Sequence, residues 1–298
     1  MSARSIGPGS GPGPGPGSGR GGTATVLLAP AKLTVSLRVV GFRPDGYHEL
    51  EAEMVSLDLA DQLEIDPGGD GLEVVAEPGS GIEVMPDAGD DNLVRRALAA
   101  VGRRAHVRLR KRIPVGGGLG GGSSDAAAVL RWAGVRDLAV AARLGADVPF
   151  CVHGGRALVR GIGESVAPRE HVDRSFVLLL PPFGVDTGAV YREWDQRAMR
   201  RESTRDLRRK GPVNDLTAPA LTAEPRLRPW SDRFGEVTGR EPSLAGSGST
   251  WWVEGTPSEL GLDGQATLRL GAEEGRLLAV RTVPSGWTGT GVGPAAAG

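Results

Sequence analysis

The sequence has a single cysteine, Cys151, among its 298 residues, and it has no long hydrophobic run. One cysteine excludes a disulfide within the chain, which fits a reducing compartment, and we interpret Cys151 as a small buried apolar residue. No apolar segment approaches the ~20 residues that cross a bilayer, and the longest, Phe176–Leu180, ends at two prolines. The first residues lack the apolar core of a secretory signal. We therefore expect a cytoplasmic protein that does not enter a membrane.

An excess of charge of one sign is also absent. The 35 lysines and arginines nearly balance the 36 acidic residues, giving a formal net charge of -1. This balance argues against a protein that binds nucleic acid or a membrane surface. Only three of the basic residues are lysines, namely Lys32, Lys111 and Lys210. In a chain that otherwise uses arginine, a lysine indicates a position where a compact ammonium group is useful.

The two ends of the chain are poor in residues that form a core. Residues 7–22 consist almost entirely of Gly, Pro and Ser, so we expect 1–23 to be a disordered tail and 285–298 to be a loose one. Between these tails, strand and helix patterns mix without strict alternation, which predicts an α+β fold. The length suits two domains, and we place them at residues 24–170 and 171–284.

Hydrophobic patterns predict the elements of both domains. We expect strands at residues 26–28, 33–39, 51–59, 61–65, 72–76, 106–113, 176–180 and 277–283. We expect helices at residues 92–101, 124–132, 135–144, 188–199, 214–221 and 231–237. Asp90 or Asp91 should cap the first helix, and Gly102 should end it.

The most informative segment is Pro114–Ala128, which reads PVGGGLGGGSSDAAA. Six glycines surround Leu119, and the residues after the two serines strongly favour a helix. Glycine permits positive φ and a close approach of the backbone to a ligand. A helix that starts after such a loop presents free N–H groups and a partial positive charge. The segment therefore predicts a site that binds phosphate groups.

Other phosphate-binding motifs fit this segment poorly. A Walker loop needs a lysine after its last glycine, and no lysine lies between Arg112 and Ala128. The dinucleotide pattern GxGxxG matches at Gly116, Gly118 and Gly121, but a run of six glycines produces that match almost automatically. The catalytic-loop and metal-binding motifs of protein kinases, HRD and DFG, do not occur.

Four segments together resemble the motifs of the GHMP kinase family in order and spacing. They are Ala29–Leu33, Gly41–Leu50, the glycine loop and Leu244–Thr250. The segments Gly145–Phe150 and Gly161–Glu164 add to the agreement, and the resemblance runs from Thr25 to Pro284. The DGYHEL sequence at 45–50 and the expanded glycine loop resemble the branch whose acceptor is a methylerythritol linked to cytidine diphosphate.

The resemblance implies a two-lobed fold, with an N-terminal domain like ribosomal protein S5 and a ferredoxin-like C-terminal domain. It implies that ATP lies on the glycine loop with Mg²⁺ and that the small-molecule acceptor lies in the cleft between the lobes. The implied reaction is ATP-dependent phosphorylation of the acceptor's 2-hydroxyl group, a step in the non-mevalonate route to isoprenoids. No nucleic-acid or membrane partner is implied, and the protein is expected to be a monomer or a homodimer.

The resemblance also assigns roles to individual residues. Asp147 is the expected base and Lys32 its cationic partner, although Asp147 also suits a turn or a helix cap and Lys32 a solvated position. The residues expected to hold the ATP phosphates are Pro114, Gly116, Gly117, Gly118, Leu119, Gly120, Gly121, Gly122, Ser123 and Ser124. One of the two serines is a plausible Mg²⁺ contact, and helix capping is the alternative role for both.

Tyr47, His48 and Tyr191 are the candidates for acceptor binding. An aromatic face stacks on a pyrimidine and a histidine hydrogen-bonds its edge, and the chain has only two tyrosines. The alternatives are that Tyr47 packs in a strand and that His48 belongs to a turn.

The chain departs from the family pattern in several places. Thr34 stands where the family usually has asparagine, residues 131–144 are shorter than usual, and Trp251 and Trp252 replace smaller residues. Two other functions stay open at this point, namely a GHMP kinase for another small alcohol and a degenerate protein that binds nucleotide without catalysis. Because Lys32 and Asp147 are both present, we favour an active enzyme.

Overall fold

The computed structural model describes residues 23–80, 82, 85–200 and 213–289. The predicted N-terminal tail, apart from residue 23, lies outside the described residues, as do Lys210 and positions 290–298 of the predicted C-terminal tail. Within the part of the chain that the structure describes, no helix is both long enough and apolar enough to span a bilayer.

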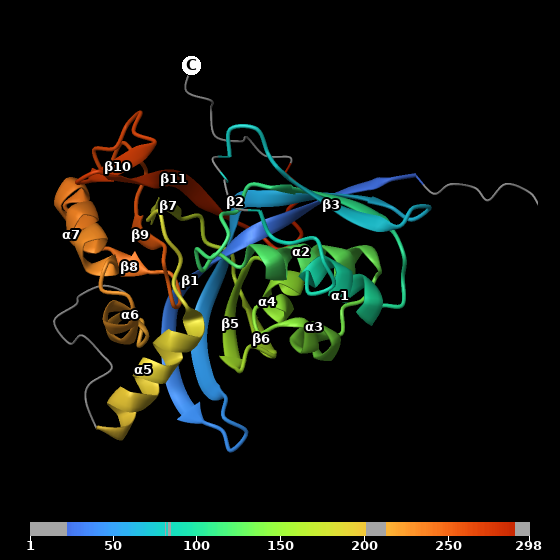
Figure 1. Cartoon of the computed structure of the whole chain (residues 1–298), viewed down its shortest axis with the longest axis horizontal. Helices are drawn as coiled ribbons and strands as arrows, with labels where there is room; N and C mark the ends of the chain where they lie inside the picture. The colour runs from blue at the N-terminus through green and yellow to red at the C-terminus, as the bar shows by residue number, and fades with distance from the viewer. Residues whose placement is uncertain (1–22, 81, 83–84, 201–212, 290–298) are drawn as a thin grey trace, which may run out of the picture.

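A long antiparallel pair of strands forms the centre of the molecule (Figure 1). β1 (Thr25–Phe42) and β2 (His48–Asp66) pair from Thr25 opposite Ile65 to Phe42 opposite His48. The sequence predicted two short strands in place of β1 and two in place of β2. The structure has one continuous strand in each case, so the predicted breaks are wrong. The register shifts between Pro30 and Lys32, and again at two later points, so irregularities absorb the proline and let the strand continue.

The N-terminal half completes one group of strands and helices around this pair. β3 (Gly71–Ala76) runs parallel to β4 (His106–Lys111), and β4 pairs with β2. β5 (Arg156–Gly161) pairs with β2 and with β6 (Ser165–Arg169). The helices are α1 (Leu93–Ala100), α2 (Gly121–Trp132), α3 (Leu138–Leu144) and α4 (Val148–His153). They gather on one side of the β1–β2 pair (Figure 1).

The C-terminal half has its own strands and helices. The strands are β7 (Ser175–Leu180), β8 (Ser243–Leu244), β9 (Trp251–Glu254), β10 (Thr267–Leu270) and β11 (Glu273–Val283). The helices are α5 (Thr187–Met199), α6 (Thr217–Ala223) and α7 (Leu227–Thr238). β7 lies between β9 and β11, and the last residues of β11 pair with Leu57 and Ser56 of β2. This mixture of sheet and helix agrees with the predicted α+β class.

Two local predictions have clear outcomes. Asn92, not Asp90 or Asp91, caps α1, because its side chain directly precedes the helix and accepts a hydrogen bond from the N–H of Val94 at 2.9 Å. Gly102 follows the last turn with φ of +62°, as a helix-ending glycine should.

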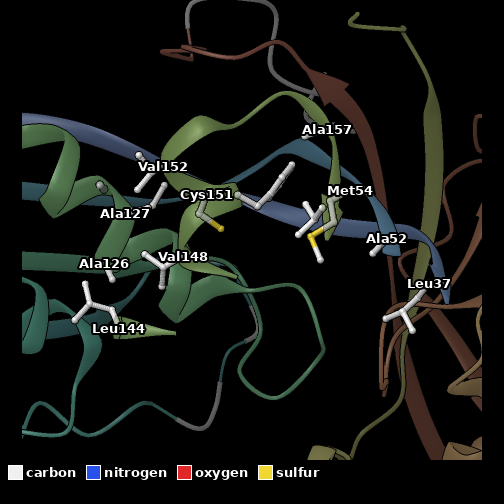
Figure 2. Close-up of a cluster of buried hydrophobic side chains, with 14 of the residues drawn as sticks. Leu37, Ala52, Met54, Ala126, Ala127, Leu144, Val148, Cys151, Val152 and Ala157 are labelled. Atoms are coloured by element: carbon white, nitrogen blue, oxygen red, sulfur yellow. The ribbon is translucent and has the colours of Figure 1, made fainter. Parts of the chain in front are cut away.

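Cys151 lies in the apolar core, as its sequence context predicted. Figure 2 shows it with Val148 and Val152 of α4 and Met54 of β2 in a cluster of buried side chains. Burial raises the pKa of the Cys151 thiol to about 12, so the group stays protonated. We therefore assign Cys151 to packing.

Candidate active site

Lys32 and Asp147 meet although they lie more than a hundred residues apart in the sequence. Lys32 belongs to β1 and is almost completely buried, and its Nζ lies 3.3 Å from Oδ2 of Asp147. The Lys32 backbone N–H donates to the carbonyl of Leu119 at 2.9 Å, which holds the glycine loop beside the same residue. The buried position contradicts the alternative that Lys32 is merely a solvated lysine.

The Asp147 carboxylate is accessible to a ligand and is not used to cap a helix. The residue occupies the position directly before α4, yet its carboxylate makes no capping hydrogen bond. About a third of the side chain is exposed, at 31%. Asp147 therefore sits at a helix start without serving as its cap, and its carboxylate is available both to Lys32 and to a ligand.

Thr34, the departure from the family pattern, takes part in this site. Its Oγ1 accepts a hydrogen bond from Lys32 Nζ at 3.2 Å, and the residue is buried. The threonine hydroxyl and the Asp147 carboxylate thus hold the ammonium group from two directions. The shorter side chain still fixes the lysine head in place.

The glycine loop passes close to Lys32 and to the 244–250 turn. A Cβ at Gly118, where φ is +74°, would lie 2.7 Å from the carbonyl oxygens of Ala245 and Gly248. A Cβ at Gly120, where φ is +69°, would lie 2.7 Å from Cγ of Lys32. Glycine is required at both positions by conformation and by space. The glycine loop and the 244–250 turn, which lie far apart in the sequence, therefore pack directly against each other.

A cavity of about 440 Å³ lies against this loop. Its lining includes residues 114–123. The start of α1 and the segment before it add Pro86, Asp87, Asp91, Asn92 and Leu93, and the residues that flank the glycine loop add Lys111, Ile113 and Asp125. Gly120 precedes α2, so the backbone N–H groups of the first helical turn have no partner within the helix. These N–H groups and the partial positive charge of the helix start suit a bound anion.

The structure separates the two serines. Ser124 is fully buried, and its hydroxyl donates to the carbonyl of Pro30 at 2.6 Å. Ser123 is half-buried and lines the cavity. Neither serine caps α2, since the residue before the helix is Gly120. Among the described residues there is no group of three or more His, Cys, Asp or Glu side chains that could hold a metal ion.

A buried charge cluster behind the loop was not predicted from the sequence. Lys111 Nζ donates to Asp61 and, at 2.8 Å, to Oδ2 of Asp125. Asp61 Oδ1 also accepts the backbone N–H groups of Arg112 and Ile113. The cluster thus ties the start of the glycine loop and the first turns of α2 to β2. The scarcity of lysine was the only sequence signal for it.

Asp125 is the carboxyl group of the cluster whose ionisation is disfavoured. Its Oδ1 is buried and has no hydrogen-bond partner among the described residues. Burial raises the pKa of Asp125 to about 8, with Asp61 adding to the shift and Lys111 opposing it. Burial disfavours the Lys111 ammonium, but Asp125 and Asp61 outweigh it, and the pKa of Lys111 is raised. Asp125 therefore holds a proton near neutral pH, and the cluster is close to neutral.

His48 and Tyr191 come together at the other end of the site. Their ring centroids lie 4.8 Å apart, although His48 starts β2 and Tyr191 belongs to α5. Burial raises the pKa of the Tyr191 phenol to about 12, and the charge of Asp147 adds to the shift. That contribution from Asp147 places Tyr191 near the Lys32–Asp147 pair. Phe42 and Trp194 complete the cluster, with ring centroids 5.3 Å and 5.1 Å from His48.

Tyr47 does not join these rings. It is exposed, at 59%, on the turn between β1 and β2, and its backbone N–H donates to Oδ1 of Asp45. No ring contact joins Tyr47 to the described aromatic residues of the cluster. The structure therefore groups His48 with Tyr191 and leaves Tyr47 at the rim, while Phe42 and Trp194 are neighbours that the sequence did not indicate.

These parts form an arrangement suited to transfer of a phosphoryl group. A cradle of backbone N–H groups lies next to a lysine–aspartate pair, and the charge of Asp147 acts on Tyr191 of the aromatic cluster. Phosphoryl transfer needs positioning, neutralisation of charge and a group that takes a hydroxyl proton. The backbone N–H groups, the Lys32 ammonium and the Asp147 carboxylate are groups of the chemical types that these three requirements call for.

Comparisons with known proteins point the same way. The model of the GHMP kinases N terminal domain matches residues 92–155. The chain is 36% identical to a 4-diphosphocytidyl-2-C-methyl-D-erythritol kinase of Pelotomaculum thermopropionicum over 293 residues, covering 86% of this chain and 96% of the relative. It is also 36% identical to the enzyme of the same name from Paracoccus denitrificans, covering 74% of this chain and 84% of the relative.

Solved structures agree in fold. A crystal structure of 4-(cytidine 5'-diphospho)-2C-methyl-D-erythritol kinase matches with a TM-score of 0.62 at 31% identity, covering 87% of this chain and 100% of that one. A homoserine kinase from Cytophaga hutchinsonii matches with a TM-score of 0.58 at 15% identity, covering 90% and 96%. The second likeness shows a shared fold alone, and it supports the predicted two-lobed α+β architecture.

Proposed function

The chain belongs to the family of 4-diphosphocytidyl-2-C-methyl-D-erythritol kinases, a branch of the GHMP kinases, and we propose a reaction and residue roles from this premise. The reaction is ATP-dependent phosphorylation of the 2-hydroxyl group of 4-diphosphocytidyl-2-C-methyl-D-erythritol, in the non-mevalonate route to isoprenoid precursors. The observation that carries the proposal is the 3.3 Å contact between Lys32 and Asp147, between the glycine loop and the aromatic cluster.

Asp147 acts as the base in the proposed mechanism. Its carboxylate accepts the proton of the acceptor hydroxyl as that oxygen forms a bond to the γ-phosphorus of ATP. The bond between the γ-phosphorus and the bridging oxygen breaks, and ADP leaves with that oxygen. Lys32 stabilises the negative charge that develops on the transferred group. The Thr34 hydroxyl keeps the ammonium group in position, since it accepts a hydrogen bond from Nζ.

The glycine loop holds the donor. The free N–H groups of residues 121–123 bind phosphate oxygens, and residues 114–120 shape the remainder of the cradle. The helix charge contributes about 0.3–1 kcal/mol, so direct hydrogen bonds supply most of the binding. The residues present fit Mg²⁺ in one place, where Ser123 lines the cavity. When bound there, Mg²⁺ would neutralise part of the negative charge of the ATP phosphates.

The aromatic cluster receives the cytidine part of the acceptor. Tyr191 offers a ring face, and His48 offers a ring nitrogen, at the end of the site opposite the glycine loop. Tyr47 directly precedes His48 in the sequence and is exposed, so it covers the cytosine ring from the solvent side. We further propose that residues 24–170 form the ATP-binding domain, that residues 171–284 form the second domain, and that the enzyme works in the cytoplasm.

A kinase for another small alcohol has less support. The homoserine kinase shares the fold at 15% identity, which carries no information on substrate. An acceptor without a nucleobase would leave the cluster of His48 and aromatic rings without a ligand. The two functions are separated by the acceptor that the enzyme turns over.

Release of ADP, measured with purified protein, ATP and Mg²⁺, tests the proposed function. We expect release that depends on 4-diphosphocytidyl-2-C-methyl-D-erythritol and a phosphorylated product in equal amount. Homoserine and mevalonate serve as control acceptors and should give only background release. Turnover of a control acceptor without turnover of the cytidine compound would overturn the assignment.

A further inference from the structure

His48 is paired with a carboxylate from a distant part of the chain. Its Nε2 lies 2.7 Å from Oδ1 of Asp195 in α5, one turn after Tyr191. The His48 side chain is only 10% exposed, while that of Asp195 is 36% exposed. Asp195 therefore reaches from the surface of α5 to a histidine that is mostly enclosed, and this contact is the direct polar link between α5 and the start of β2.

The His48 ring is held in orientation as well as in place. The rings of Phe42 and Trp194 meet it edge-on, with interplanar angles of 75° and 86°, and Tyr191 lies tilted at 32°. Neighbours on several sides restrict rotation of the imidazole. Because Asp195 adds a hydrogen bond at one nitrogen, the two ring nitrogens are no longer equivalent.

The pairing determines where the imidazole proton lies. An ionised carboxylate only accepts hydrogen bonds, so Nε2 of His48 must carry the proton that Asp195 binds. In the neutral ring, Nδ1 then has a lone pair and acts as an acceptor. Nδ1 makes no hydrogen bond with any residue that the structure describes, so this lone pair has no protein partner there.

We propose that Asp195 is a positioning residue that makes His48 selective for cytosine. In the proposed function, on which this role rests, a ring nitrogen of His48 binds the cytosine; Asp195 makes that nitrogen Nδ1, which then accepts from the 4-amino group. Uracil carries a carbonyl oxygen at that position, and two acceptors repel each other. Asp195 thereby discriminates between cytidine-linked and uridine-linked acceptors without touching either one.

The steady-state test compares the cytidine-linked substrate with its uridine-linked analogue. We expect wild type to prefer the cytidine compound by about 100-fold or more in kcat/KM, because the uridine compound leaves a polar group unpaired. Asp195→Ala frees the ring to protonate at either nitrogen. It should raise KM for the cytidine compound about tenfold and lower the preference by a similar factor, with KM for ATP unchanged.

Two further variants separate positioning from general structure. Asp195→Asn keeps an oxygen that accepts from Nε2, so it should restore the preference to within about twofold of wild type. Glu193→Gln removes ion pairs with Arg197 and Arg200 on the same helix but none with His48, and it should leave all constants unchanged. The ¹⁵N spectrum of the His48 imidazole gives a second readout, with the proton on Nε2 in wild type and on both nitrogens in Asp195→Ala.

The possible failures are distinguishable. If wild type does not turn over the cytidine compound, the proposed function is wrong. If wild type is active but Asp195→Ala keeps its acceptor KM and its preference, or if the spectrum of wild type shows the proton on Nδ1, the role of Asp195 alone is overturned. Equal use of the cytidine and uridine compounds by wild type would likewise overturn it.

Discussion

The donor end and the acceptor end of this site are built by different means. At the donor end, the backbone of one continuous segment forms the cradle, and a buried cluster of Lys111, Asp61 and Asp125 ties that segment to β2. At the proposed acceptor end, rings from β1, β2 and α5 form a cluster, and a hydrogen bond between the enclosed His48 and the partly exposed Asp195 joins β2 to α5. The Lys32–Asp147 pair has a link to each, since the Lys32 backbone N–H donates to Leu119 of the loop and the charge of Asp147 acts on Tyr191 of the cluster.

This difference suits the ligand that we propose for each end. Phosphate is recognised by N–H groups that every residue possesses, so geometry and small size matter more than side-chain identity. A base is recognised by its face and by the pattern of donors and acceptors on its edge, which only particular side chains match. Substitutions at the donor end should therefore act through shape and stability, and substitutions at the acceptor end through affinity for one substrate.

The largest effect on turnover is expected from a substitution in the Lys32–Asp147 pair. Asp147→Asn removes the base, and we expect kcat to fall about 10²–10⁴-fold, with little change in KM for either substrate. Initial rates of ADP release measure this effect. Asp173→Asn, at an aspartate whose side chain is 98% exposed, is the matched control and should retain wild-type activity. If the Asp147→Asn enzyme releases ADP as fast as wild type, Asp147 is not the base.

Next in size should be a loss of stability at the donor end. Lys111→Met leaves two buried carboxylates without their cation, and we expect the free energy of unfolding to fall by about 3–5 kcal/mol. Urea denaturation measures the change. Arg112→Met replaces the neighbouring exposed cation and should have a much smaller effect. Equal effects of the two substitutions would show that the buried cluster does not stabilise the loop.

A glycine substitution should separate the donor end from the acceptor end. Gly118→Ala places a methyl group against the carbonyls of Ala245 and Gly248, so the loop must move. We expect kcat/KM for ATP to fall about 100-fold, with KM for the acceptor unchanged. Gly134→Ala is the control, because Gly134 has φ of +75° but no atom within 4 Å of the added Cβ. If both variants retain kcat/KM, close packing of the loop is not needed.

The complementary substitution at the acceptor end is Tyr191→Ala. Loss of a stacked ring costs about 1–3 kcal/mol, so KM for the cytidine compound should rise about 5–100-fold, with KM for ATP unchanged. Tyr191→Phe keeps the ring and should stay close to wild type, because the Tyr191 hydroxyl remains neutral with a pKa of about 12. A rise in KM for ATP with Tyr191→Ala would contradict the assignment of Tyr191 to acceptor binding.

The donor end should also show a pH dependence of stability. The folded protein keeps a proton on Asp125, whose pKa is raised to about 8, while the unfolded chain has released it. Wild type should therefore lose stability as pH rises from the ordinary carboxyl range to about 8. Asp125→Asn removes this dependence, so its stability relative to wild type should increase over that range in thermal unfolding. Asp232→Asn, at an exposed position, should follow wild type.

The sequence predicted the donor end better than the acceptor end. A run of glycines before a helix is visible in the sequence, and the cavity lies against that run. The sequence also indicated Lys32, Asp147, His48 and Tyr191, but only through resemblance to a family. The resemblance grouped Tyr47 with His48, whereas the structure leaves Tyr47 exposed on the turn before β2 and encloses His48 at the first position of that strand.

Other features escaped prediction because they depend on pairing between distant segments. Asp61 and Lys111 meet because β2 and β4 pair, and Asp195 meets His48 because α5 lies along the end of the β1–β2 pair (Figure 1). The continuity of β1 through Pro30 was also missed, since an irregular register accommodates the proline. None of these contacts leaves a periodic signal within a short window of sequence.

The sequence by itself determined the α+β class, the phosphate-binding loop and the absence of a long apolar span, because composition, glycine content and local periodicity act over neighbouring residues. The tertiary structure alone decided which charges share a buried site, which serine lines the cavity, and which carboxylate pairs with His48. Those properties depend on distances between atoms that are far apart in the chain, and only the folded backbone sets such distances.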